Sequence, residues 1–135
     1  MRRHDWPERL AEYVEAARDV PFAWGAHDCC TLAARWVEIA TGRPVLAPFR
    51  AQFGAWDDVR TGMRVLVQAG GLNAIVERVL GAPVHPAYAS RGDVVQVEID
   101  ARASLAVVVG DHAAGAGPAG VAFVPRAHWR AGWVV

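Results

Sequence analysis

The spacing of apolar residues changes near Pro83, and this change constrains the fold more than any other feature of the sequence. Before Pro83, apolar residues recur every three or four positions, which is typical of amphipathic helices. After it, Val95, Val97 and Ile99 occupy alternate positions, and this alternation indicates a β-strand. Helices followed by strands predict an α+β fold, in which N-terminal helices pack on a small antiparallel sheet of about four to five strands.

The helix limits follow from capping residues and apolar stripes. The first helix is expected to begin at Asp5, with Glu8 at the capping-box position. The second should begin at Asp28 and stop at Gly42, with Thr31 on its exposed face. Two further helices are expected from about 57 to 69 and from 72 to 80.

Two segments lack a clear pattern and are expected to be loops. Residues 45–54 include proline and follow another proline, and residues 110–120 are rich in glycine. The expected strands lie between and after these segments, at residues 93–99, 104–109, 121–124 and 133–135.

Length and composition exclude several classes of protein. A chain of 135 residues predicts one domain, spanning 1–135. Its basic residues are all arginines scattered singly, so no basic stripe favours nucleic-acid binding. No apolar run approaches the roughly 20 residues that span a bilayer, and none follows the first arginines as in a secretory signal. We therefore expect a protein made in the cytoplasm without membrane insertion.

The segment from Pro21 to Gly42 contains the only two cysteines, Cys29 and Cys30, at the expected start of a helix. Unpaired N–H groups and the helix dipole stabilise a thiolate there, so Cys29 is the candidate nucleophile. Adjacent cysteines cannot form a relaxed disulfide, so free thiols are expected. Trp24, in the preceding loop, is a candidate wall of a binding cleft.

Several motifs resemble the NlpC-type cell-wall peptidases, which are papain-like cysteine enzymes of bacteria. Asp28-Cys29 resembles their nucleophile motif, and Arg91-Gly-Asp93-Val-Val resembles the start of one of their strands. The sequence is also similar to a small group of phage and prophage proteins related to that superfamily. The similarity to this group lies in Phe22-x-Trp-Gly-x-x-Asp-Cys29, Gly70-Gly-Leu72, Arg91-Gly-Asp93 and the closing Trp-Arg-x-x-Trp133.

The resemblance implies a papain-like fold in which Cys29 is the nucleophile, a histidine on the second strand is the general base, and a polar residue on the next strand orients that histidine. The sequence departs from this pattern, because Ser104 stands where the histidine is expected and Val121–Val124 has no polar side chain. Of the remaining histidines, His112 is the best candidate base, although an extended strand would place it about 25 Å from Ser104. Asp28 and Trp24 are the candidate binding residues.

Three functions remain open. The first is a phage tail-associated hydrolase that cleaves peptides of bacterial peptidoglycan through Cys29. The second is an inactive structural component of a phage tail tip or baseplate, which would contact other tail proteins. The third is a thiol acyltransferase. Cys29 could also be only a small buried hydrophobic residue, as Cys30 is expected to be. No cofactor or metal is expected, because the cysteines lack the second ligand cluster of a structural zinc site.

Overall fold

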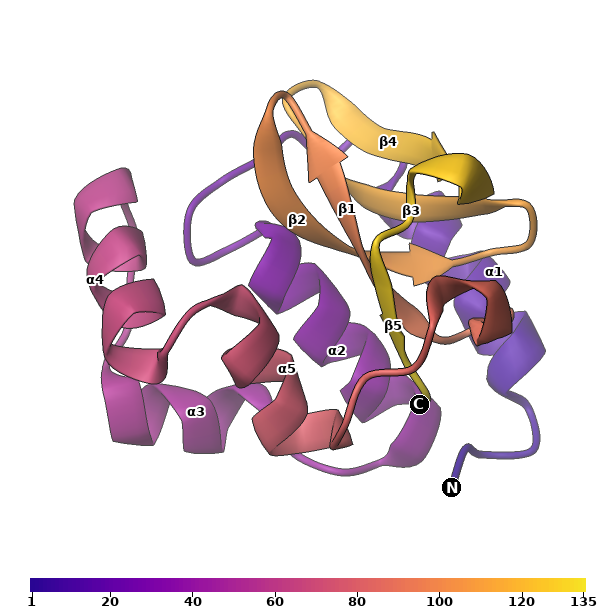
Figure 1. Cartoon of the computed structure of the whole chain (residues 1–135), viewed down its shortest axis with the longest axis horizontal. Helices are drawn as coiled ribbons and strands as arrows, with labels where there is room; N and C mark the ends of the chain where they lie inside the picture. The colour runs from indigo at the N-terminus through magenta and orange to yellow at the C-terminus, as the bar shows by residue number, and fades with distance from the viewer.

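Helices and strands are segregated along the chain, as the apolar pattern predicts. The computed structural model describes all residues from Met1 to Val135 (Figure 1). The five α-helices are α1 (Trp6–Ala17), α2 (Cys29–Thr41), α3 (Leu46–Phe53), α4 (Val59–Ala69) and α5 (Leu72–Leu80). The strands are β1 (Val94–Ile99), β2 (Arg102–Val108), β3 (His112–Gly117), β4 (Gly120–Pro125) and β5 (Ala131–Trp133). Short 3-10 helices cover Pro86–Tyr88 and Arg126–His128.

The strands form one antiparallel sheet in the order β4-β3-β2-β1-β5. The α+β prediction is therefore confirmed. Helix α2 packs directly against β2 on one face of this sheet, where Val37, Leu105 and Trp133 share a buried cluster. Two residues outside the strands pack on the opposite face of the sheet. They are Ala89, which precedes β1 in the sequence, and Trp129, which lies between β4 and β5. No helix is both long enough and apolar enough to cross a membrane.

Two segments expected to be loops are regular elements. Residues 46–53 form α3, whose aromatic residues Phe49 and Phe53 pack against each other and against Trp56. Residues 112–117 form β3, although their sequence is only histidine, alanine and glycine. The glycine at the end of β3 is required by the hairpin, because a Cβ atom on Gly117 would lie 2.6 Å from the backbone carbonyl oxygen of Gly120.

The capping predictions have mixed outcomes. Asp5 precedes α1, but its carboxylate accepts a hydrogen bond from Arg9 and caps no backbone N–H, so the capping box with Glu8 is wrong. Asp28 does cap α2, as predicted. Thr31 is fully buried rather than exposed, because its hydroxyl accepts from the Asp28 backbone N–H and completes that capping box.

The segment before β1 is held by a buried carboxylate. Asp93 follows the Arg91-Gly turn, and its carboxylate accepts from the Ser90 N–H. It also accepts from the Val135 N–H and forms an ion pair with Arg2 at 2.6 Å. Asp93 thereby joins residues from three distant parts of the chain, beside the carbonyl of Gly92 that accepts from the buried indole of Trp36.

Candidate functional site

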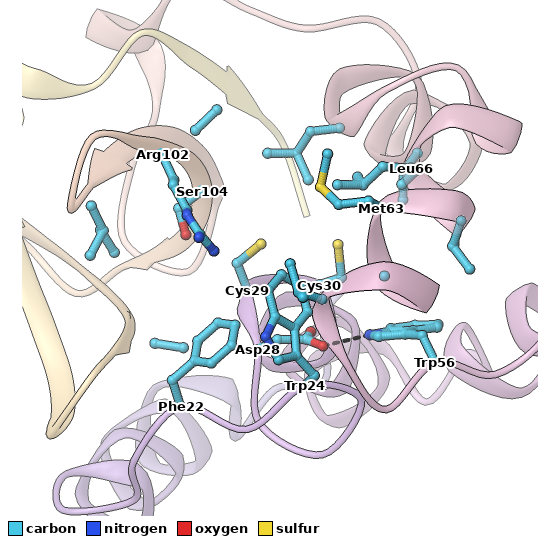
Figure 2. Close-up of a pocket in the computed structure, with 18 of the residues that line it drawn as sticks. Phe22, Trp24, Asp28, Cys29, Cys30, Trp56, Met63, Leu66, Arg102 and Ser104 are labelled. Carbon is cyan, nitrogen blue, oxygen red and sulfur yellow. Dashed lines mark hydrogen bonds between the residues drawn. The ribbon is translucent and has the colours of Figure 1, made fainter.

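A cavity of about 800 Å³ lies at the start of α2. The loop bearing Trp24, the helices α4 and α5, and the β1–β2 hairpin surround it (Figure 2). Its volume is within the range of small-molecule sites, which is roughly 300–1,000 Å³. Cys29 and Cys30 both line it, and Figure 2 shows the two sulfur atoms pointing into the same space.

Asp28 fixes the geometry at the bottom of the cavity. Its buried carboxylate accepts hydrogen bonds from the Thr31 N–H at 2.8 Å, the Gly25 N–H at 2.8 Å and the Trp56 indole at 2.6 Å. These donors satisfy both carboxylate oxygens, so Asp28 positions the site rather than presenting a free charge to a ligand. Gly25 comes so close to Trp56 that a Cβ atom on it would lie 1.9 Å from the Trp56 carbonyl oxygen.

Cys29 is the first residue of α2 and is only half-buried. The backbone N–H groups of Cys29 and Cys30 donate to no acceptor in the protein, as is usual for the first turn of a helix. Both groups are therefore available to an anion or a polarised carbonyl oxygen at the helix start.

The surroundings of Cys29 favour its thiolate. The pKa of Cys29 is lowered chiefly by the neighbouring Cys30 thiol, then by the Leu105 backbone N–H and the Ser104 hydroxyl, while burial and the negative charge of Asp28 oppose the change. The pKa of Cys30 is raised well above its ordinary value, first by its interaction with Cys29 and then by burial. The two thiols thus divide the roles of thiolate and proton donor between them.

The β1–β2 hairpin supplies the free polar groups at the edge of the cavity. Asp100, Arg102 and Ser104 line this edge, and Arg102 makes no ion pair or side-chain hydrogen bond within the protein. The guanidinium of Arg102 extends towards Cys29 in Figure 2. The turn residues Asp100 and Ala101 have φ values of 51° and 62°, as the type I′ turn of a two-residue β-hairpin requires.

The other side of the cavity is entirely apolar. Helix α4 contributes Val59, Gly62, Met63, Val65 and Leu66. Gly71, Leu72 and Ile75 continue this wall into α5. The sequence pattern identified α4 as amphipathic, but it gave no indication that this helix would face Cys29.

Trp24 is part of the cavity wall, as predicted. Its ring packs edge-to-face on Phe22, with the ring centroids 5.0 Å apart. It also lies over Gly62, where a Cβ atom would come within 2.9 Å of the indole ring. Glycine at position 62 therefore lets α4 approach the Trp24 loop closely.

The close approach of Gly62 to Trp24 leads to a prediction about stability. Alanine at position 62 gains about 1 kcal/mol of helix propensity but must displace the indole, and overpacking of this kind costs roughly 1–3 kcal/mol. We expect Gly62→Ala to lower the free energy of unfolding in urea by about 1 kcal/mol. In a Trp24→Ala background the same change should instead be stabilising, and stabilisation in both backgrounds would contradict the packing argument.

The structure does not bring His112 to Cys29. His112 is exposed and begins β3, and its carbonyl accepts from the Val109 N–H at the end of β2 farthest from Ser104. The chain turns back between Val109 and His112, so the sequence-based separation of about 25 Å is too long. The extended chain from Ser104 to Val109, which lies beside His112, still spans about 17 Å. His112 is therefore far beyond hydrogen-bonding distance of Ser104.

His27 does not line the cavity either, although it lies two residues before Cys29. Its Nε2 atom is buried without a hydrogen-bond partner, and burial lowers the pKa of this imidazole. The residues that line the cavity include no histidine.

Fold and cavity together define an α+β protein with a thiol at a helix start and a mainly apolar cavity. The chain belongs to the family described as a domain of unknown function, DUF6950, whose match covers residues 1–135. No curated protein matches the sequence.

Proposed function

We propose that the protein is a papain-like domain of the NlpC type and a phage tail-associated hydrolase that cleaves peptides of bacterial peptidoglycan through Cys29. The observation that carries the enzymatic part is the position of Cys29, whose thiol opens into the cavity beside two free backbone N–H groups. The resemblance of the Asp28-Cys29 and Arg91-Gly-Asp93 motifs to those families supports the fold type and the phage setting.

The chemistry requires one nucleophile and one oxyanion site. The Cys29 thiolate attacks the carbonyl carbon of an amide, and the N–H groups of Cys29 and Cys30 stabilise the oxygen as it becomes negative. When the intermediate collapses, the C–N bond breaks and the amine leaves with a proton taken from water. Water then hydrolyses the thioester, which releases a carboxylic acid and restores the thiol.

The proton transfers are the weak part of this reaction. An imidazole normally accepts the thiol proton and returns it to the departing amine, and general acid–base help of this kind contributes roughly a hundredfold to ten-thousandfold. Ser104 cannot replace it, because a serine hydroxyl does not titrate near neutral pH. We therefore expect slow amide hydrolysis that depends on the thiolate of Cys29.

The pH dependence of alkylation tests whether Cys29 is activated. We expect carboxamidomethylation of Cys29 by iodoacetamide, followed by mass spectrometry of the Cys29 peptide, to rise with pH to a midpoint below the ordinary cysteine pKa of about 8.5. The rate rises with pH because only the thiolate reacts. Cys30→Ala should move the midpoint upwards, since Cys30 makes the largest contribution to the lowered pKa. Cys30→Ser, which keeps a hydrogen-bond donor, is the matched control. An unreactive Cys29, or a midpoint at or above 8.5, would overturn the proposal of a nucleophile.

Digestion of purified peptidoglycan tests the substrate. The wild-type protein should release new amino groups slowly, and Cys29→Ala should release none. Equal release by both proteins would show that the cysteine is not used.

The second candidate is an inactive structural component of a phage tail tip or baseplate on the same fold. The absence of histidine from the cavity favours it. This candidate predicts no difference between wild type and Cys29→Ala in peptidoglycan digestion, together with retained binding to other tail proteins in both.

A further inference from the structure

The cavity has two chemically different sides, and this difference indicates which kind of acyl group the cavity can hold. The thiol of Cys29 lies near the hairpin side, where Arg102 and Ser104 supply hydrogen-bonding groups. The side formed by α4 and α5 contains no side chain able to form a hydrogen bond. An apolar group is therefore favoured on that side, because a polar atom that it covered would find no hydrogen-bond partner in the protein.

We propose that the acyl group accepted by Cys29 carries a bulky apolar chain, which occupies the space between Trp24, Met63 and Leu66 while its carbonyl lies at the start of α2. This inference rests on the proposed nucleophilic role of Cys29 and goes beyond the proposed peptide substrate, because it concerns a second class of acyl group that the same cavity would accept. The cavity volume of about 800 Å³ leaves room for such a chain beside the reacting carbonyl.

Acyl esters of p-nitrophenol are suitable probes for this selection. The Cys29 thiolate attacks the ester carbonyl carbon, a C–S bond forms, the C–O bond breaks, and p-nitrophenolate leaves with the electron pair. This leaving group needs no proton, so the reaction does not require the missing imidazole. Water then cleaves the thioester into the fatty acid and the free thiol.

The experiment compares acetyl, butanoyl and hexanoyl esters. Transfer of one methylene from water into an apolar site is favourable by roughly 0.8 kcal/mol, which can raise the rate by a factor of up to about four. We expect the second-order rate of p-nitrophenolate release, divided by the rate for free glutathione with the same ester, to rise at least tenfold from acetyl to hexanoyl. Mass spectrometry should find the acyl group on Cys29.

Two variants of α4 distinguish an effect of the cavity wall on chain-length preference from an effect of the exposed helix surface. Leu66→Ser places a hydroxyl in the apolar wall, and it should reduce the hexanoyl preference several-fold while alkylation of Cys29 by the small reagent iodoacetamide is unchanged. Val67→Ser is the matched control, because Val67 is 76% exposed and lies outside the cavity. It should keep the full chain-length dependence.

The outcomes distinguish this inference from the proposed function. If iodoacetamide reveals an activated Cys29 but all three esters react at the same relative rate, the apolar acyl site is wrong and the nucleophile stands. The same conclusion follows if Leu66→Ser retains both folding and the full preference. If neither iodoacetamide nor any ester modifies Cys29, the proposed function itself fails.

Discussion

Replacing Asp28 with asparagine is expected to lower the free energy of unfolding by about 2–3 kcal/mol. The carboxylate accepts from three donors, with Thr31 on one oxygen and with Gly25 and Trp56 on the other. An asparagine amide has only one oxygen, so in either orientation its NH₂ group faces at least one of these N–H donors. A buried donor left unpaired costs roughly 1–3 kcal/mol, and loss of the negative charge at the helix start adds about 0.3–1 kcal/mol.

The chain contains a matched control for this change. Asp58 caps α4 through the same arrangement with Thr61, but it is exposed and has no third donor. Water can replace the lost interactions there, so Asp58→Asn should lower the free energy of unfolding much less than Asp28→Asn does. Urea denaturation followed by circular dichroism measures both values. Equal losses for the two variants would contradict the assignment of Asp28 as the residue that holds the Gly25 loop, α2 and Trp56 together.

Asp28→Asn should also change the reactivity of Cys29, both because it removes a negative charge that raises the pKa of the two thiols and because it loosens the turn that carries them. The carboxylate holds the loop against the first turn of α2, and that turn carries both thiols and their free N–H groups. We expect the alkylation rates of the two cysteines to become more alike in this variant, because their different surroundings depend on the order of that turn. Asp58→Asn should leave both rates as they are in the wild type.

Local sequence patterns predicted the helix start that carries Cys29, because its determinants are close together in the chain. Asp28 caps α2 and Cys29 follows the cap directly, whereas Thr31, which completes the capping box, was wrongly expected on the exposed face. The sequence also drew attention to the Trp24-Gly25 pair, but it could not show why glycine is needed at position 25. That reason is the close approach of the Trp56 carbonyl, from a residue far along the chain.

The rest of the cavity depends on contacts that no local pattern encodes. Met63 and Leu66 become cavity walls only because α4 lies opposite Cys29, and Arg102 faces the site because β2 begins beside α2. Strand β3 was missed for a similar reason. Its alanines and glycines have little strand preference of their own, and the pairing with β2 and β4 on either side determines its conformation.

Ser104 has a different role from the histidine that the motif resemblance predicts at its position. The alignment of motifs placed it where an imidazole would meet the thiol, and Ser104 does lie beside Cys29. It contributes to the lowered pKa of Cys29 by hydrogen bonding, whereas the proton acceptor itself is missing. Under the proposed function, this missing acceptor is the reason that amide cleavage should be slow.

Replacing Arg2 with methionine is expected to destabilise the fold by about 3 kcal/mol. Arg2 pairs with the buried Asp93 and donates to the backbone carbonyls of Arg91 and Val135. Methionine keeps an apolar stem against Trp6, over which the guanidinium now stacks at 4.4 Å, but leaves the Asp93 charge without its counterion. Removing one partner of a buried ion pair costs roughly 3–5 kcal/mol, and the lower end applies because Arg2 is 16% exposed.

The Arg9–Asp5 pair supplies the comparison for Arg2. Both of its side chains are well exposed, at 40% and 36%, so Arg9→Met should lower the free energy of unfolding much less than Arg2→Met does. Urea denaturation at low and high salt separates the two cases further, since screening weakens the exposed pair much more than the buried one. A loss of less than 1 kcal/mol for Arg2→Met would mean that the turn before β1 is stable without its counterion. In that case Gly92 and the hydrogen bonds from Ser90 and Val135 would be sufficient to hold the start of the sheet.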